Sequence, residues 1–212
     1  MLSNPSIKLG KRAIISGRTG SGKSTLACWF LSRSNFRWII VNPKWTSAYK
    51  NLSGSTILKN LSIKEIDKKI KQYQYLILNI GGIEAQPEIL DEFIGILHEG
   101  YRDIGLCIDE LYAVHHNGRA GEGLINFLTR GREFRQSFLG LTQRPAWLTK
   151  FLYSECDYLG IMALNLLDDR KRLYEQIGRD TILKSLPPQK WYWYDVNKDN
   201  LRLFSPIPVD NI

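Results

Sequence analysis

Gly17-Arg-Thr-Gly-Ser-Gly-Lys-Ser24 decides the fold, because it fits the phosphate-binding pattern G-x-x-x-x-G-K-[ST] at every required position. The apolar run Ala13-Ile-Ile-Ser16 precedes it, and an amphipathic stretch at residues 23–33 follows. A strand, a glycine-rich loop and a helix in this order let backbone N–H groups and the helix dipole hold phosphate oxygens. We therefore expect nucleotide contacts along the whole loop, from Gly17, Arg18, Thr19, Gly20, Ser21, Gly22, Lys23, Ser24 and Thr25.

The last three residues of this loop have separate expected roles. Lys23 would neutralise the β- and γ-phosphates, and Ser24 would bind Mg²⁺ through its hydroxyl group. Thr25 is placed to meet the α-phosphate. ATP and Mg²⁺ are therefore the expected cofactors, and the alternative is a glycine-rich turn that holds no ligand.

A second motif, Leu106-Cys-Ile-Asp-Glu110, is an apolar strand that ends in two carboxylates. An acid at the end of a buried strand is costly unless it meets a cation, so Asp109 is expected to hold the Mg²⁺ shell. Glu110 would align or deprotonate the attacking water. Two adjacent acids favour ATP hydrolysis over simple nucleotide binding, and the alternative is an acidic strand end that arose by chance.

Apolar strand-like runs alternate with helical patterns along the chain, which is typical of a mostly parallel α/β sheet with helices on both faces. The expected strands are residues 12–16, 37–42, 75–80, 104–109, 138–142 and 158–163. The expected helices are residues 23–33, 88–98, 123–135 and 168–177, with another that starts at a capping box of Ser62 and Glu65. The aromatic segment at about 188–206 predicts an antiparallel hairpin at the sheet edge, and cross-strand packing of its rings is favoured over base stacking.

The composition indicates one globular domain, residues 1–212, because 43% of its residues are apolar and 24% are charged. No apolar run reaches the ~20 residues of a membrane span, and the first residues lack a signal-peptide pattern. We therefore expect a soluble intracellular protein without a membrane span. Lys and Arg exceed Asp and Glu by 29 to 21, and the net charge of +8 favours nucleic acid as a partner, with solubility alone as the alternative.

Residues 129–145 form a third motif, TRGREFRQSFLGLTQRP. Its strand ends at Gln143, whose amide would sense the γ-phosphate from a position next to the phosphate loop. The arginines before this strand are too numerous for packing alone, so one of them would stabilise the transferred phosphoryl group in a neighbouring subunit's site. A solvated basic face is the alternative for any single arginine.

The three motifs in this order resemble the FtsK/HerA branch of P-loop ATPases, whose members translocate double-stranded DNA as ring hexamers. The resemblance covers about residues 8–177 and implies an ASCE, RecA-like P-loop NTPase core. FtsK and HerA proteins are longer, with membrane, winged-helix or barrel domains. A stand-alone core of this length is similar to the genome-packaging ATPases of tailless icosahedral viruses with an internal membrane, bacterial or archaeal, as is the segment at residues 168–178.

This resemblance implies further roles for single residues. It makes Glu110 the catalytic carboxylate and Gln143 the γ-phosphate sensor, and the spacing back from Gln143 makes Arg132 the trans-acting arginine finger, with Arg130 as the second choice. Pore loops that touch DNA would fall after the second strand and after the acidic strand, which points to Lys44, Trp45, His115, His116 and Arg119. The sequence departs from many relatives at Asn42, which stands where they have an acidic residue.

The resemblance implies an ATP-hydrolysing translocase of double-stranded DNA that packages a viral genome into a preformed capsid. It would form a homo-oligomeric, hexameric ring and meet a capsid vertex or membrane-associated packaging proteins. Its place would be the host cytoplasm or the packaging vertex of the virion. Three alternatives stay open: a plasmid-transfer or chromosome-segregation motor, a nucleotide-gated DNA-binding or assembly factor with negligible hydrolysis, and a small-molecule P-loop kinase.

Overall fold

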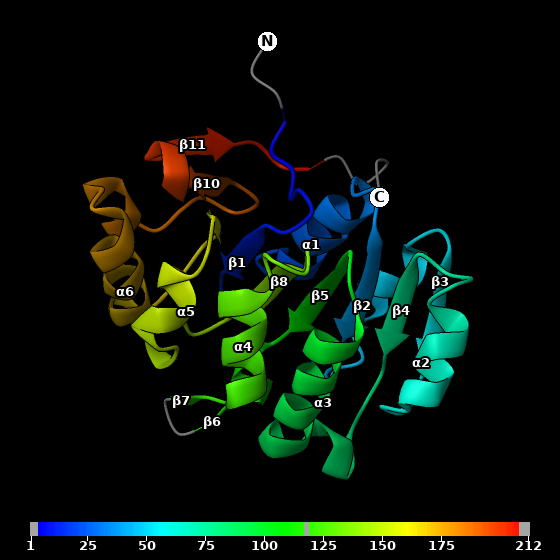
Figure 1. Cartoon of the computed structure of the whole chain (residues 1–212). Helices are drawn as coiled ribbons and strands as arrows, with labels where there is room; N and C mark the ends of the chain where they lie inside the picture. The colour runs from blue at the N-terminus through cyan, green and yellow to red at the C-terminus, as the bar shows by residue number, and fades with distance from the viewer. Residues whose placement is uncertain (1–3, 117–118, 208–212) are drawn as a thin grey trace.

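One mostly parallel sheet of nine strands runs through the computed structural model, which describes residues 4–116 and 119–207. Its strands are β1 (Arg12–Ser16), β2 (Arg37–Val41), β3 (Ser55–Leu58), β4 (Tyr75–Leu78), β5 (Ile104–Asp109), β8 (Ser137–Thr142), β9 (Tyr158–Ile161), β10 (Trp191–Asp195) and β11 (Asn200–Phe204). They lie in the order β11-β10-β9-β1-β8-β5-β2-β4-β3, and the β10–β11 hairpin adds the antiparallel pairs (Figure 1). The expected α/β fold with an antiparallel C-terminal hairpin is confirmed.

Six helices of the described residues flank this sheet, and two very short strands form a hairpin outside it. The helices are α1 (Lys23–Ser32), α2 (Ile63–Lys69), α3 (Pro87–Gly100), α4 (Glu122–Arg130), α5 (Lys150–Ser154) and α6 (Leu167–Ile177). The short strands are β6 (His115–His116) and β7 (Arg119–Ala120). Within the described part of the chain, none of the helices has the length and apolarity that crossing a bilayer requires.

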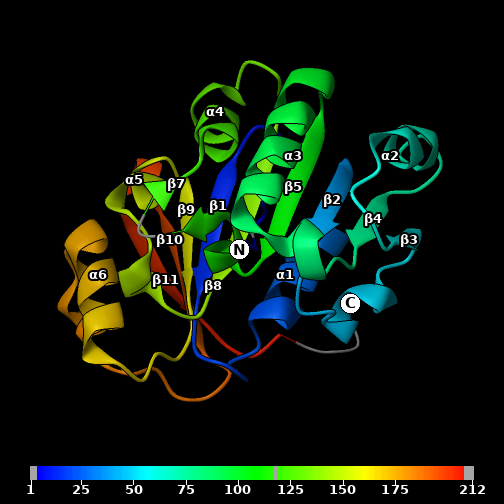
Figure 2. The same ribbon diagram turned by 90° about the horizontal axis from the view of Figure 1, so that it is seen from below.

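The strands bury side chains on both faces, because their apolar residues alternate between two hydrophobic cores. In β1, Ile14 belongs to one core, whereas Ala13 and Ile15 belong to the other. The first core contains side chains from α2 to α6, and the second contains those of α1. Figure 2 shows α3 and α4 on one side of the sheet and α1 on the opposite side. This double coverage explains why the central strands are apolar along their whole length.

Strand β8 lies between β1 and β5 and pairs with both in parallel. Ser16 at the end of β1 is opposite Thr142, and Asp109 at the end of β5 is opposite Leu141. Because the carboxyl ends of parallel strands share one edge, the loops that follow these strands meet there. The strand order therefore brings the phosphate loop, Glu110 and Gln143 to the same edge of the sheet.

The C-terminal hairpin is part of the core on the α1 side. Trp191 and Trp193 are both 2% exposed, and the ring of Trp193 stacks on Phe30 of α1 with centroids 4.6 Å apart. Trp191 also stacks on Phe204 across the hairpin, with centroids 4.6 Å apart. The expectation that these rings serve packing is confirmed, since neither tryptophan offers an open face for stacking with a nucleic-acid base.

Several elements differ from the expectations: α5, β6 and β7 were not expected, and two further differences have a clear physical reason. The helix expected at residues 123–135 ends at Arg130, because Gly131 starts a turn in which the Gln136 N–H donates to the Gly131 carbonyl at 2.7 Å. Arg135 in that turn has a positive φ of 54°, which a continuing α-helix excludes. The edge strand β3 was not expected, since only Leu58 of its four residues is buried.

Candidate nucleotide-binding site

The phosphate loop is fixed to the two strands that flank β1. The Gly17 N–H donates to the carbonyl of Thr142, the last residue of β8, at 3.1 Å, and the Arg18 N–H donates to the carbonyl of Ala163 after β9 at 2.8 Å. A Cβ atom on Gly17 would lie 2.8 Å from the Cβ of Met162, so only glycine fits this close approach. Gly22 precedes α1 with a φ of 95°, a left-handed conformation that favours glycine.

Lys23 lies inside the loop and its ammonium group donates to the Arg18 carbonyl at 2.9 Å. Burial lowers the pKa of Lys23 to about 8, and the nearby carboxylate of Glu110 offsets only part of this effect. The lysine is 8% exposed, so its charge has little contact with water. A phosphate group at the loop would supply the anion that this buried amine lacks, which fits the role expected for Lys23.

Ser24 and Asp109 bring together oxygen atoms suited to Mg²⁺. The hydroxyl of Ser24 lies 3.5 Å from each carboxylate oxygen of Asp109, and Asp109 is 5% exposed at the end of β5. Magnesium prefers such hard oxygen ligands and usually takes only one or two of them from protein, with waters and phosphates filling the remaining positions. The two side chains therefore fit a magnesium ion shared with a nucleotide. No group of three His, Cys, Asp or Glu residues suited to a metal occurs among the described residues.

Glu110 lies at the centre of a line of four polar side chains. Its Oε2 atom accepts hydrogen bonds from the Lys44 ammonium group at 2.5 Å and from the Gln143 amide at 3.2 Å. The Oε1 atom of Gln143 in turn accepts from the Thr19 hydroxyl at 2.5 Å. Glu110 has a φ of 118°, a strained backbone position of the kind that occurs at functional sites. Loops after β1, β2, β5 and β8 thus converge next to the phosphate loop.

The remaining residues of the phosphate loop differ in their exposure. Arg18, Thr19 and Gly20 are exposed, Ser21 is buried, and Ser24 and Thr25 are half-buried at the start of α1. All nine positions expected to contact nucleotide therefore lie on one continuous loop and helix start. The fold brings Lys23, Asp109 and Glu110 together at this edge.

The comparison with known sequences finds a viral relative. The DNA packaging ATPase P9 of Enterobacteria phage PRD1 is 28% identical over an alignment of 212 positions, which covers 94% of this chain and 88% of P9. The chain is a homologue of P9. The resemblance to packaging ATPases, stated above on three motifs, is confirmed at this level. No protein-family model matches the sequence.

Solved structures show the same fold. The DNA-packaging ATPase B204 of Sulfolobus turreted icosahedral virus superposes with a TM-score of 0.73 at 20% identity, covering 95% of this chain and all of B204 (100%). VirB4 of Thermoanaerobacter pseudethanolicus superposes with a TM-score of 0.66 at 10% identity, covering 93% of this chain and 89% of VirB4. The chain therefore has the fold of the P-loop ATPases.

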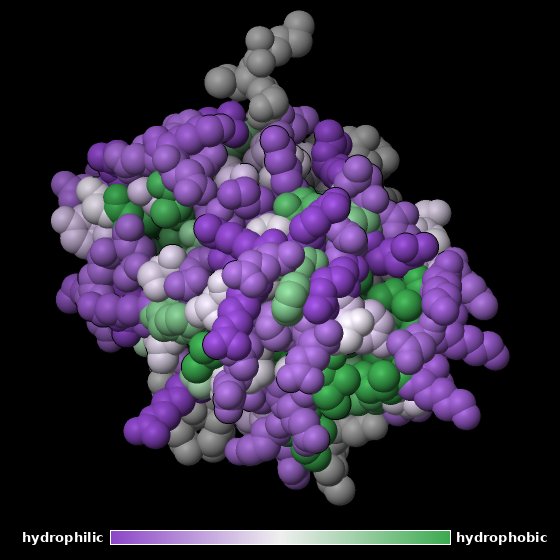
Figure 3. Space-filling model, in the orientation of Figure 1, coloured by the Kyte–Doolittle hydropathy of each residue, from purple (hydrophilic) through white to green (hydrophobic). Residues whose placement is uncertain are grey.

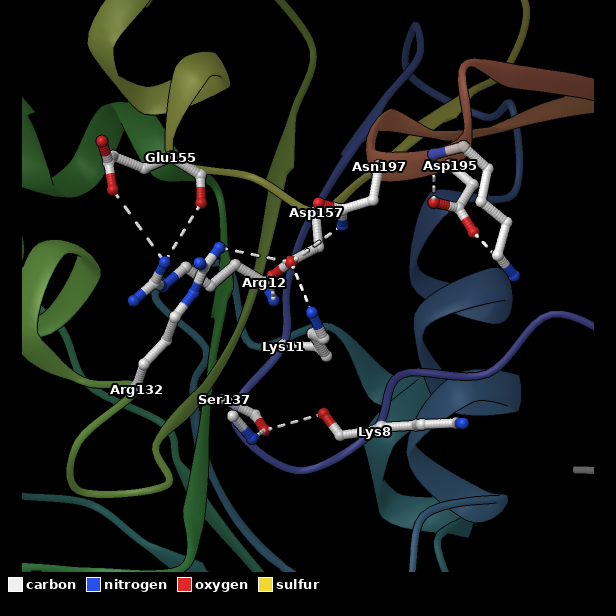
Figure 4. A network of polar contacts seen from close by, with 11 residues as sticks. Lys8, Lys11, Arg12, Arg132, Ser137, Glu155, Asp157, Asp195 and Asn197 are labelled. Atoms are coloured by element: carbon white, nitrogen blue, oxygen red, sulfur yellow. Dashed lines mark hydrogen bonds and ion pairs between the residues drawn. The ribbon is translucent and has the colours of Figure 1, made fainter.

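The two candidate finger residues of the third motif, Arg132 and Arg130, lie away from the chain's own phosphate loop. Arg132 donates to the Oδ1 atom of Asp157 at 3.3 Å, and its side chain is 57% exposed (Figure 4). Asp157 directly precedes β9 and also accepts from the N–H of Arg12, the first residue of β1. Arg132 is therefore at the amino ends of the strands, opposite the nucleotide edge of its own chain. Arg130, at the end of α4, is also exposed.

Asp157 is a residue that sequence reasoning missed. Its side chain is fully buried, and its Oδ1 atom also accepts from Lys11 at 2.8 Å and Asn197 at 3.2 Å (Figure 4). Burial alone would raise the pKa of Asp157, but the hydrogen bonds from Lys11, the Arg12 N–H and Asn197 outweigh it and hold the pKa below its usual value. Its partners come from separate parts of the chain, so no sequence spacing could have revealed it.

The residues expected to touch DNA have different surroundings. Trp45 is 55% exposed, and Lys44 is exposed although it pairs with Glu110. The expectation that His115 contacts DNA was wrong. His115 is 0% exposed, and its Nε2 atom accepts from the Thr149 N–H at 3.2 Å, so its ring cannot contact DNA. Arg119 is exposed and pairs with His116 in the β6–β7 hairpin. The side chain of His116 lies outside the described part of the structure.

An exposed group of three side chains near Gln143, formed by Tyr112, Arg144 and Trp147, was not expected. The rings of Tyr112 and Trp147 lie 5.2 Å apart, and the guanidinium of Arg144 lies 4.3 Å over Trp147. The two rings are 46% and 50% exposed. The face drawn in Figure 3 is mostly hydrophilic, with its apolar side chains in separate patches. An arginine and two open rings near the nucleotide edge suit contact with another macromolecule.

Proposed function

We propose that this chain is a viral genome-packaging ATPase that hydrolyses ATP to ADP and phosphate and uses the energy to move double-stranded DNA into a capsid. The observation that carries the proposal is the position of Glu110. It lies at the nucleotide edge, held by Lys44 and Gln143, beside a loop that contains Lys23. Homology to P9, a DNA packaging ATPase, supports the same activity.

Each residue at this edge has a separate proposed role in ATP hydrolysis. Lys23 neutralises the β- and γ-phosphates, while Ser24 and Asp109 would hold Mg²⁺, which supplies further positive charge to the phosphates. Glu110 takes a proton from the attacking water, and Gln143 connects it to Thr19 on the phosphate loop. Loss or gain of the γ-phosphate would change the contacts between Thr19, Gln143 and Glu110. The change at the phosphate loop would thereby reach Lys44.

The catalytic site would be completed by a second copy of the chain. Arg132 is exposed at the edge of the sheet opposite the phosphate loop, where it can enter the site of the next subunit in a ring, expected to be a hexamer. The net charge of +8 supports a polyanionic partner, and Lys44, Trp45 and Arg119 remain the proposed DNA contacts. Action in the host cell, at a capsid vertex or with membrane-associated packaging proteins, follows from the packaging role.

The test uses two variants that each remove half of the shared site. Glu110→Gln removes the catalytic carboxylate from a subunit's own nucleotide site. Arg132→Ala removes the arginine that the subunit supplies to its neighbour's site. Each variant alone should be inactive, whereas mixing them should restore hydrolysis, because about one quarter of the junctions in a random ring combine an intact Glu110 with an intact Arg132. Double-stranded DNA should raise the rate of the parent and of the mixture.

Arg135→Ala is the matched control, since Arg135 is an exposed arginine of the same turn and pairs with Asp103 on its own chain. It should keep the parent's rate and its dependence on protein concentration. A rate that is independent of concentration, indifferent to DNA and unaffected by Arg132→Ala would refute the translocase. Such a result would favour the small-molecule kinase, and screening of phosphate acceptors would follow.

A further inference from the structure

The turn that contains Arg132 is fastened to the fold through its backbone. The buried side-chain amide of Gln136 donates to the carbonyl of Tyr101, just after α3, at 2.7 Å. A Cβ atom on Gly131 would lie 2.2 Å from the carbonyl oxygen of Phe127, so the start of the turn requires glycine. The backbone under Arg132 is therefore fixed, and the position of its guanidinium group depends on what holds the side chain.

Asp157 holds that side chain by a single nitrogen. The Nη2 atom of Arg132 donates to Oδ1 of Asp157 at 3.3 Å, and in the part of the chain that the structure describes this is the only hydrogen bond of the guanidinium (Figure 4). The side chain of Arg132 is 57% exposed, whereas that of Asp157 is fully buried. The remaining N–H groups of the arginine can therefore donate to an anion that approaches from outside the chain.

The carboxylate of Asp157 is held by three further donors. Its Oδ2 atom accepts from the N–H of Arg12 at 3.0 Å, and its Oδ1 atom accepts from Lys11 at 2.8 Å and from Asn197 at 3.2 Å. Asn197 lies in the turn of the C-terminal hairpin, where the N–H of Val196 also donates to the main-chain carbonyl of Asp157 at 3.0 Å. The buried carboxylate therefore keeps its place and its hydrogen bonds when the arginine moves.

A second guanidinium group beside Arg132 explains why its position depends on this carboxylate. The side chain of Arg12 is 2% exposed and lies next to that of Arg132 (Figure 4). Among the described residues, the Nε and Nη2 atoms of Arg12 have no hydrogen-bond partner, and its Nη1 atom donates to the Glu155 carbonyl at 3.4 Å. Burial and the charge of Arg132 both lower the pKa of Arg12, so the two cations repel each other. Without the charge of Asp157, this repulsion would drive the exposed Arg132 away from its present position.

We propose that Asp157 is the positioning residue of the trans-acting arginine: it holds Arg132 so that the free N–H groups meet the γ-phosphate in the next subunit's site. This inference rests on the proposed function. Arg132 touches the phosphate, and Asp157 acts only through Arg132. A free arginine side chain has many rotamers, and holding it near one of them lowers the entropic cost of reaching the transition state. Through Asn197, the C-terminal hairpin also contributes to the neighbour's site.

The first test compares Asp157→Asn with the parent at pH 7, at a protein concentration where the parent's rate per subunit is constant. The kcat should fall about 10- to 100-fold, because a small misplacement of a catalytic group can cost about 10²-fold. The KM for ATP should stay within about 3-fold, since the variant's own phosphate loop lies at the other edge of the sheet. Glu155→Gln is the matched control, because it makes the same change of carboxylate to amide but pairs with Arg12 instead of Arg132. It should keep the parent's rate.

Mixing experiments show which half of the shared site is affected. Asp157→Asn keeps Glu110 and loses only the half that serves the neighbour, so Glu110→Gln subunits should restore its hydrolysis and Arg132→Ala subunits should not. Adding Asp157→Asn to Arg132→Ala should cause no further loss of kcat, because the carboxylate acts only through that arginine. A purely structural role would lower the rate in both backgrounds.

Asn197→Ala tests the same carboxylate without removing a buried charge. Asn197 is exposed, so this variant should fold like the parent, and its kcat should fall about 2- to 3-fold only when Arg132 is present. Parental kcat in Asp157→Asn, or a loss that persists in the Arg132→Ala background, would overturn the proposal. If Asp157→Asn does not fold, parental kcat in Asn197→Ala would overturn it. The proposed function fails on a different result, in which Arg132→Ala and Glu110→Gln both keep the parent's rate.

Discussion

Replacing Lys44 with methionine tests whether the loop after β2 controls hydrolysis. Lys44 and Gln143 both donate to the same oxygen of Glu110, Oε2, so these two hydrogen bonds hold the carboxylate in one orientation. Lys44 is also a proposed contact for DNA, whose phosphates would compete with Glu110 for the ammonium group. The pair would then lower hydrolysis in the absence of DNA, and DNA would relieve this restraint.

The expected magnitude follows from the exposure of the pair. The side chains of Lys44 and Glu110 are 43% and 16% exposed, so the pair belongs with partly solvated ion pairs that are worth about 0.2–1 kcal/mol. If that energy holds Glu110 in its unproductive position, its loss speeds hydrolysis roughly 1.5- to 5-fold, at 1.36 kcal/mol for each factor of ten. ATP affinity should not fall, because Lys44 is also a like charge near Lys23.

The assay measures phosphate release from the parent and from Lys44→Met, with and without double-stranded DNA, at saturating ATP. We expect a higher DNA-free rate in the variant and a smaller ratio between the two conditions. Lys50→Met is the control, since Lys50 is an exposed lysine of the following 3-10 helix, Ser47–Asn51. A DNA-free rate that falls in Lys44→Met, or a DNA response equal to the parent's, would refute the reasoning.

Three further predictions concern buried charges and the catalytic carboxylate. Because burial lowers the pKa of Lys23 to about 8, ATP binding at pH 9 should draw a proton onto its amine, and calorimetry in two buffers of different ionisation enthalpy should detect uptake at pH 9 but none at pH 6.5. Glu110→Gln should slow hydrolysis about 10²- to 10⁴-fold while the ATP dissociation constant stays within about 3-fold, and a loss under tenfold would exclude Glu110 as the base. Asp157→Asn should cost about 1–3 kcal/mol of unfolding free energy at pH 7. Since the pKa of Asp157 lies below 3.8 in the folded chain, the advantage of the carboxylate is complete above that value and fades as the pH falls below it, so denaturant titrations at pH 3 should show a smaller difference than at pH 7.

The central strands could be predicted almost residue by residue, because burial on both faces makes them continuously apolar. Strands β1 and β5 have the expected bounds, and β8 begins one residue earlier than expected. The outermost strand, β3, gave no such signal, since only Leu58 of its four residues is buried. The helix expected at residues 123–135 was too long at its C-terminal end. Gly131 could have indicated this, because glycine often ends helices.

The site was predictable where one motif contains the interacting residues and less so where the fold brings distant ones together. The contact between Lys44 and Glu110 joins residues 66 positions apart, and it exists because β2 pairs with β5. His115 was expected on an open loop, but residues Leu111–Val114 form a 3-10 helix that turns its ring inward. Local spacing carries no information about either arrangement.

The positions of the two half-sites have a consequence for assembly. Each chain presents its phosphate loop at the carboxyl edge of the sheet and Arg132, held by Asp157, at the amino edge. A site that needs both halves therefore forms only when the carboxyl edge of one subunit meets the amino edge of the next. Such head-to-tail contacts repeat around a ring when the rotation between subunits closes, and every junction of the ring then combines the two halves. The positions of the phosphate loop and Arg132 on a single chain are thus compatible with the ring proposed for the ATPase.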